Sequence, residues 1–106
     1  MSEEIIICTL NGVQWALGEE SEKLLNWNAA LTWCKSIGQE LPPREVLLIA
    51  YLSPEIKGSF ANNFYWSSTD NDTDSDYAWA QYFDDGYQNQ YNKYNIFAVR
   101  AVRRIT

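Results

Sequence analysis

Apolar and polar positions at the start of the chain follow the pattern of a β-hairpin. Residues 5–10 form an apolar, β-branched run, and residues 13–17 form a second apolar run. Asn11-Gly12 between them is a strong signal for a two-residue turn, because both positions of such a turn need residues that accept a positive φ. We therefore predict two antiparallel strands. Gly18 is expected to end the second strand, and Glu19–Lys23 to form a charged connector.

Two helices follow in the hydrophobic pattern. Residues with helical spacing form one apolar face of the first helix: Trp27, Ala30, Leu31, Cys34 and Ile37. Asn26 is a suitable N-cap for it, and Gly38 a suitable C-terminal stop. The second helix is predicted over Arg44–Leu52, where apolar residues occur almost all round and indicate deep burial. Ser53-Pro54 is expected to end it.

From Tyr65 onward the periodicity changes to that of strands. Residues 78–83 form one strand, and Asp84-Asp85-Gly86 predicts a hairpin turn after it. Residues 87–95 are polar on both faces, so this segment is predicted to lie outside the core. The apolar run Ile96–Val102 is expected to form the closing strand.

Length and composition bound the fold. A chain of 106 residues is predicted to be a single domain, spanning residues 1–106, and to bury about two-thirds of its unfolded surface. The order strand, strand, helix, helix, strands predicts an α+β fold. Aromatic residues make up 15% of the chain and suffice for a core. The aromatic residues expected in that core are Trp15, Trp27, Trp33, Trp66, Trp79 and Phe83.

Acidic residues dominate the charge and are unevenly placed. The net charge of −6 argues against direct nucleic-acid binding, which needs clustered Lys and Arg. Six Asp and no basic residue lie between Asp70 and Gly86, whereas residues 87–106 are basic. Two interpretations fit: two solvated faces that partly neutralise each other, or an acidic loop for a basic partner. Arg100 and Arg103 are expected to pair with carboxylates as structural residues.

The N-terminus and the cysteines bear on location. Met-Ser-Glu-Glu is acidic where a secretory signal is basic, and no stretch approaches the roughly 18 apolar residues of a membrane span. These features predict a cytoplasmic protein without membrane contact, and a virion-associated protein would share them. Cys8 and Cys34 are then expected to be free, buried thiols, because disulfides are rare in reducing compartments.

Several motifs together resemble a known family. Residues 65–69 are Tyr-Trp-Ser-Ser-Thr, and residues 99–103 are Val-Arg-Ala-Val-Arg. Over residues 26–104 the chain resembles the bacterial and phage domain named after the C-terminal domain of the Lcl collagen-like adhesin, which has a C-type-lectin-like fold. The resemblance implies two helices packed on twisted, mainly antiparallel strands, with the N- and C-terminal strands adjacent. Where the family has Thr or Ser after Leu-Pro, this chain has Pro43.

Catalytic and metal-binding chemistry find little support. The chain has no His, so the commonest general base is missing, and neither Cys8 nor Cys34 has a His partner to activate it. Aspartates at 70, 72, 74 and 76 alternate as in a calcium loop, but the Gly and Glu that an EF-hand requires are absent. We predict no enzyme, no cofactor and no metal site, with a weak calcium site as the open alternative.

Tyr and Asn are concentrated in residues 87–95. Evolved binding loops have this composition, because Tyr gives large contact area at low entropic cost and Asn gives adaptable hydrogen bonds. An ordinary polar hairpin with surface Tyr is the alternative. The candidate binding residues are Asp72, Asp74, Asp76, Asp84, Asp85, Tyr87, Asn89, Tyr91, Asn92 and Tyr94.

Three functions follow as alternatives. The first is a non-enzymatic binding module of bacterial or phage origin that recognises a protein through these polar loops. The second is an acidic, phage-type intracellular inhibitor that occludes a basic nucleic-acid-binding surface of a host defence complex. The third is a lectin-like domain that binds carbohydrate. A protein partner is favoured over a glycan because no export signal is visible. The C-type-lectin-like fold hosts several of these functions and does not decide between them.

Overall fold

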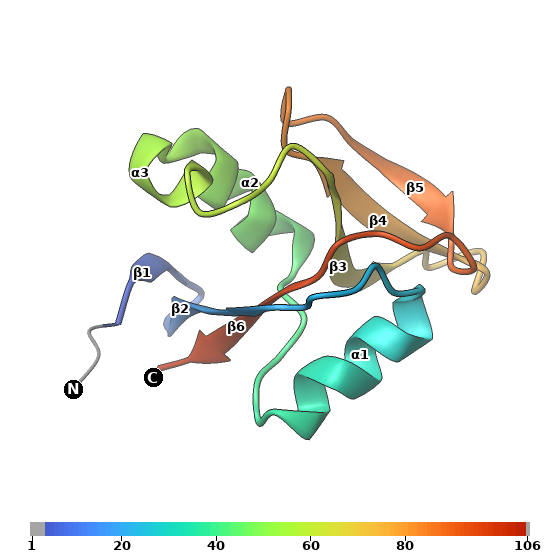
Figure 1. The fold of residues 1–106 in the computed structure, drawn as a ribbon, viewed down its shortest axis with the longest axis horizontal. Helices are drawn as coiled ribbons and strands as arrows, with labels where there is room; N and C mark the ends of the chain where they lie inside the picture. The colour runs from blue at the N-terminus through green and yellow to red at the C-terminus, as the bar shows by residue number, and fades with distance from the viewer. Residues whose placement is uncertain (1–3, 106) are drawn as a thin grey trace.

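The structure, a computed structural model, describes residues 4–105 as three helices and six strands (Figure 1). In chain order they are β1 (Ile6–Leu10), β2 (Val13–Glu20), α1 (Trp27–Ser36), α2 (Arg44–Leu52), α3 (Pro54–Lys57), β3 (Phe64–Asp70), β4 (Tyr77–Tyr82), β5 (Gln88–Asn92) and β6 (Arg100–Arg104). The predicted cytoplasmic location rests in part on the acidic N-terminus, of which residues 1–3 lie outside the described residues. Within residues 4–105, none of the helices is long and apolar enough to cross a membrane.

The strands form two antiparallel sheets of three, in the orders β1-β2-β6 and β3-β4-β5. The predicted α+β class is confirmed. The expected adjacency of the N- and C-terminal strands is wrong for β1, because β2 pairs with β6, for example through Leu17 and Val102. β2 takes the central place because residues 15–17 are buried in succession and need neighbours on both sides, whereas β1 has exposed residues at its edge.

Both predicted helices are present with the expected bounds. α1 begins after Asn26, whose Oδ1 accepts a hydrogen bond from the backbone N–H of Ala29 at 2.9 Å. Gly38, with a φ of 72°, lies just beyond its end. α2 covers the predicted Arg44–Leu52. The expected stop at Ser53-Pro54 does end α2 but also begins α3, because proline lacks only an N–H that the first helical turn leaves unbonded.

The predicted break at Gly18 is wrong, since β2 continues through it to Glu20. A Cβ at position 18 would lie 2.7 Å from the backbone oxygen of Ala101 in β6. It would also displace the side chain of Gln39, whose Oε1 accepts a hydrogen bond from the backbone N–H of Glu19 at 3.0 Å. Glycine is therefore required here for the close approach of β6 and Gln39, and not for a turn.

The buried residues form two clusters, one with α2 and one with α1, on opposite sides of the C-terminal segment (Figure 1). Residues of this segment alternate between them. Ala98 and Val102 belong to the α2 cluster, whereas Val99 and Ala101 belong to the α1 cluster. One extended segment therefore contributes to both cores through the two-residue period of a strand.

The predicted closing strand Ile96–Val102 is only partly right, because the regular strand β6 begins at Arg100. The residues before it form isolated bridges instead, from Phe97 to Leu25 and from Ala98 to Tyr65. This segment passes from β3 of one sheet to β2 of the other. It changes pairing partner on the way, so no continuous ladder forms.

The Tyr-Trp-Ser-Ser-Thr motif in β3 ties separate segments together. The Tyr65 hydroxyl donates a hydrogen bond to Glu20 Oε2 at 3.0 Å and accepts one from the backbone N–H of Ala61 at 2.8 Å. Trp66 is fully buried, and its Nε1 donates to the backbone oxygen of Leu25 at 2.9 Å. Both side chains satisfy their polar atoms inside the fold, which makes them part of the scaffold.

The second half of the motif positions α2. Ser67 is buried, and its Oγ donates to the backbone oxygen of Trp79 in β4 at 2.7 Å. Thr69 Oγ1 accepts a hydrogen bond from the backbone N–H of Arg44, the first residue of α2, at 3.1 Å. The residue in the N-cap position is Pro43, which has no side-chain acceptor. Thr69 therefore supplies from β3 the hydroxyl that Pro43 lacks.

The expected aromatic core is confirmed for Trp15, Trp66 and Phe83, which are buried. It is wrong in part for Trp27, Trp33 and Trp79, which are half-buried. Trp27 and Trp79 each have a cationic side chain of the same chain over the ring, Lys93 at 4.1 Å and Arg44 at 3.6 Å from the ring centre.

The predicted structural pairs of the late arginines are present. Arg100 Nη1 lies 3.2 Å from Glu20 Oε1, and Arg103 pairs with Glu4. Cys8 and Cys34 are free thiols, as predicted, although only Cys34 is fully buried. Burial raises the pKa of Cys34 to about 12, so this thiol is protonated at neutral pH and is not a nucleophile.

Candidate functional site

The β4–β5 hairpin carries most of the predicted binding residues. Its strands pair in unbroken register from Tyr77–Asn92 to Gln81–Gln88. The turn at residues 84–87 is fixed by hydrogen bonds from Gly86 N to Tyr82 O at 2.7 Å and from Tyr82 N to Tyr87 O at 2.8 Å. Gly86 has a φ of 82°, as a glycine in such a turn permits. The predicted turn is confirmed, and it forms a defined platform.

The predicted binding residues separate into two groups at opposite ends of this hairpin. Asp84, Asp85 and Tyr87 lie at the turn, whereas the loop of residues 70–76 and Tyr94 lie at the open end. Four strand steps of about 3.4 Å separate the ends of β5, which places the groups roughly 14 Å apart. They therefore form two surfaces and not one.

Side-chain oxygens of the acidic loop, residues 70–76, accept hydrogen bonds from the backbone of the same loop. Asn71 Oδ1 accepts hydrogen bonds from the backbone N–H groups of Thr73 and Asp74, at 2.7 Å and 3.0 Å. Asp74 Oδ1 accepts one from the backbone N–H of Asp76 at 3.0 Å. Asp72 is exposed. These oxygens stabilise the loop and do not converge on a common centre.

Lys93 brings a positive charge to the acidic loop. Its Nζ lies 3.5 Å from Asp70 Oδ2, donates to the backbone oxygen of Ser75 and lies 4.1 Å from the ring centre of Trp27. The loop contains no basic residue of its own, but the fold brings Lys93 into contact with it. Among the described residues, no group of three His, Cys, Asp or Glu side chains is arranged to hold a metal ion.

The prediction that residues 87–95 lie outside the core is wrong for Tyr91. It is half-buried and packs against the α1 cluster. Its ring meets the rings of Phe64 and Phe97 edge-on, with centroids 5.2 Å and 5.4 Å away. Desolvation by burial raises the pKa of its hydroxyl. The segment is polar by composition, but its strand still has one face on the protein.

An aromatic column lies beside Tyr91. It consists of Tyr82, Phe64 and Phe97, which stack in that order with centroid separations of 4.6 Å and 5.1 Å. All three rings are half-buried, so they combine rigid packing with accessible edges. The sequence did not single out these residues, because a stack between neighbouring strands depends on pairing partners that a single strand pattern does not specify.

The exposed end of this column completes a surface. Tyr87 and Asn89 are exposed, and Asn89 Nδ2 donates a hydrogen bond to the Tyr87 hydroxyl at 2.9 Å. Alternation along β5 puts both on the same sheet face as Tyr91, opposite to α2. We call this the hairpin surface and define it by Tyr82, Asp84, Asp85, Tyr87, Asn89 and Tyr91.

The remaining candidate residues have local roles. Asn92 Oδ1 accepts a hydrogen bond from the backbone N–H of Tyr94 at 2.9 Å and so shapes the turn after β5. The Tyr94 side chain is 85% exposed and lies near the acidic loop and not the hairpin surface. Its exposure leaves it free for contact at that end of the hairpin.

The opposite face of the hairpin is a glutamine network that holds α2. Gln81 is fully buried, and its Nε2 donates to the backbone oxygen of Leu47 at 2.8 Å. Gln88 Nε2 bonds Gln81 Oε1 and the backbone oxygen of Arg44, while its own Oε1 accepts from Arg44 Nε at 3.0 Å. This network fixes the hairpin to the rest of the molecule and leaves the hairpin surface exposed.

No protein-family model matches the chain, and a search of curated proteins found no match. The resemblance to the Lcl C-terminal domain remains a prediction based on residues 65–69 and 99–103. In the structure these motifs form the scaffold, and the hairpin surface lies between them in the sequence.

Proposed function

We propose that this chain is a non-enzymatic module that recognises a partner protein through the hairpin surface. The observation that carries the proposal is the half-buried aromatic column with exposed Tyr87 and Asn89 at its end. Interfaces concentrate binding energy in well-packed aromatic residues with nearby hydrogen-bonding groups. A preorganised surface also loses little conformational entropy on binding.

The order of the elements and the resemblance support a C-type-lectin-like fold of bacterial or phage origin as part of this proposal. A cytoplasmic location is part of this proposal, with association with a virion as its alternative. The free thiols Cys8 and Cys34 agree with a reducing compartment.

The acidic-inhibitor function is the second candidate, because Asp72, Asp74 and Asp76 are exposed together at the other end of the hairpin. Charge mimicry of nucleic acid would act through these residues. The roughly 14 Å between the two ends of the strand allows each surface to be changed without touching the other.

Affinity capture with the immobilised chain, followed by calorimetry on the partner it retains, tests both candidates. We expect Tyr87→Ala with Asn89→Ala to weaken binding by about tenfold or more, as for hot-spot residues. Replacing Asp72, Asp74 and Asp76 by Asn is the control and should change the affinity by less than about twofold, with a weak dependence on salt. Binding that collapses with salt and with the Asn variants, but not with the Ala variants, would instead establish the inhibitor.

A further inference from the structure

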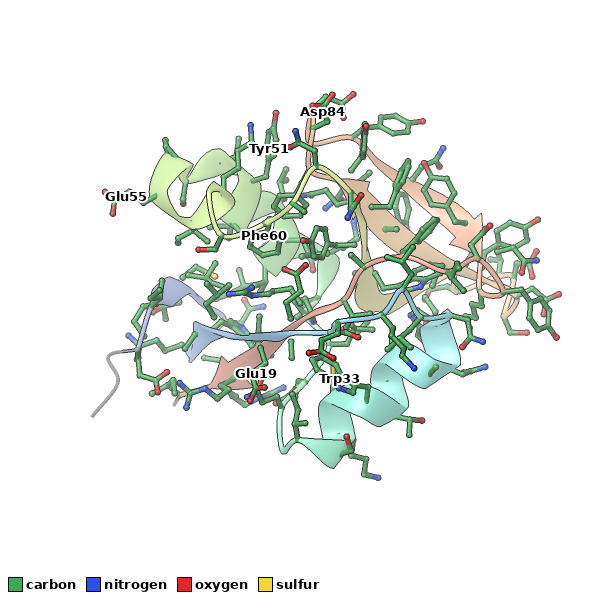
Figure 2. All side chains as sticks on the ribbon, viewed as in Figure 1. Glu19, Trp33, Tyr51, Glu55, Phe60 and Asp84 are labelled. Carbon is green, nitrogen blue, oxygen red and sulfur yellow. The ribbon has the colours of Figure 1, made fainter. Side chains whose placement is uncertain are left out.

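A hollow of about 710 Å³ lies between the segment of residues 19–25 and one side of α1, apart from the hairpin surface. Its volume falls within the roughly 300–1,000 Å³ of ligand pockets. Leu25 and Ala29 provide apolar lining, and Glu19, Glu22 and Trp33 are among the residues around it. Figure 2 shows Glu19 and Trp33 on the lower side of the molecule, away from Asp84 at the hairpin turn.

The hollow has an excess of carboxylates. Glu19, Glu20 and Glu22 line it together with a single basic residue, Lys23. Both oxygens of Glu20 are already used, by Arg100 Nη1 at 3.2 Å and by the Tyr65 hydroxyl at 3.0 Å. Within residues 4–105, the carboxylates of Glu19 and Glu22 make no ion pair. These two exposed acids are available to a cation from outside.

Trp33 differs from the other tryptophans in a way that also indicates a cation as the ligand. Trp66 is fully buried, and three others have a cation of the chain over the ring: Arg104 on Trp15 at 4.8 Å, Lys93 on Trp27 at 4.1 Å and Arg44 on Trp79 at 3.6 Å. Among the described residues, no Lys or Arg lies over Trp33, although this half-buried ring borders an acidic hollow. Tryptophan is the best aromatic partner for a cation.

We infer that this hollow binds a Lys or Arg side chain from an extended, basic segment of a partner protein. The cation lies over Trp33 and within reach of Glu19 and Glu22, while its aliphatic stem contacts Leu25 and Ala29. Charge complementarity selects a basic partner. A second copy of this chain is a poor occupant, because each copy carries a net charge of −6 and the two copies would repel each other.

The test uses the full chain and a blocked pentapeptide, Ala-Arg-Ala-Lys-Ala, followed by amide chemical shifts. We expect shifts concentrated in residues 19–25 and 29–36 and at the indole N–H of Trp33. A peptide with Gln in place of Arg and Lys should produce none. The double variant Glu19→Gln, Glu22→Gln should weaken binding at least fivefold, and because both carboxylates are exposed, the fold should remain intact.

The matched control is Asp72→Asn with Asp74→Asn, which removes the same charge from another exposed site. It should change the affinity for the peptide by less than twofold. Equal weakening by the two pairs would show non-specific attraction and overturn the proposal, as would shifts centred on residues 70–76. A dimer in sedimentation that competes with the peptide would identify a second copy as the occupant and would also overturn it. None of these outcomes depends on the hairpin surface.

Discussion

At the scale of single residues, two glutamines of the β4–β5 hairpin have opposite hydrogen-bonding states. Gln81 is fully buried with both amide atoms bonded, whereas Gln90 Oε1 in β5 is buried without a partner among the described residues. A buried polar atom stabilises only when it is bonded, because it has lost its hydrogen bonds to water. The same substitution should therefore have different effects at the two positions.

We expect Gln81→Met to lower the free energy of unfolding by about 1–3 kcal/mol, because the backbone oxygen of Leu47 and the Nε2 of Gln88 each lose a hydrogen bond. Gln90→Met is the control and should be neutral or slightly stabilising, since it removes an unbonded atom. Urea unfolding of both variants measures the difference. Equal losses would show that side-chain shape, and not hydrogen bonding, determines the stability of this face.

The sequence could not distinguish these residues. Gln81 lies in an alternating strand whose polar positions usually face water, and it is buried only because α2 crosses that face of the sheet. The prediction that Gly18 ends the second strand is wrong for a related reason. The absence of a Cβ at this position allows the close approach of β6, which is about eighty residues further on. Signals of this kind depend on contacts between distant segments, which local patterns do not contain.

At the scale of elements, one polar cluster joins β2, β3 and β6. Tyr65 of β3 and Arg100 of β6 both bond Glu20 of β2. Burial raises the pKa of the Tyr65 hydroxyl from 10 to about 12, and the charge of Glu20 acts in the same direction. The folded protein therefore favours the neutral phenol. Stability from this group is complete below pH 10 and is lost as the pH rises from 10 to 12.

We expect Tyr65→Phe to lower the free energy of unfolding at pH 7 by about 1–2 kcal/mol, because Glu20 and the N–H of Ala61 each lose a partner. The difference from the wild type should shrink between pH 10 and 12, since phenylalanine does not ionise. Denaturant unfolding across this range measures both effects. Tyr94→Phe is the control, because that side chain is 85% exposed. A constant difference across the range would contradict the buried titration.

Elements with local signals were predicted well. The turn at Asn11-Gly12, the cap at Asn26 and the bounds of α2 follow from residues within one or two turns of each other. The division of the strands into two sheets was not predicted, because pairing joins segments that are far apart in the chain. The start of β6 was missed for the same reason, since residues 97–98 bridge other segments before β6 joins β2.

At the scale of the whole molecule, composition indicated a candidate segment but not the geometry of its surface. Composition selected residues 87–95, and the structure places Tyr87 and Asn89 on an exposed face of that segment. It also separates them from the acidic loop and adds Tyr82 and Phe64, which composition did not select. The strand pattern indicates which residues share a face of the hairpin. How far the hairpin surface lies from the acidic loop depends on how the strands pair and pack on the scaffold.

The whole molecule also depends on the C-terminal segment that lies between its two cores. Val102 packs with the α2 cluster and Val99 with the α1 cluster, and both are almost fully buried. Because one rigid segment serves both clusters, loss of packing on one side should weaken the other. We expect Val99→Ala and Val102→Ala each to cost about 1–3 kcal/mol through the cavity that they leave.

Native-state hydrogen exchange then distinguishes a shared core from two independent ones. Either valine variant should lower the protection of slowly exchanging amides in both sheets by the same free energy, because both sheets open in one cooperative step. Ile96→Ala is the control, since this residue of the same segment is 58% exposed, and exposed substitutions usually stay within about 0.5 kcal/mol. If Val99→Ala lowered protection only near α1, the two clusters would be separate folding units, and the C-terminal segment would connect them without coupling them.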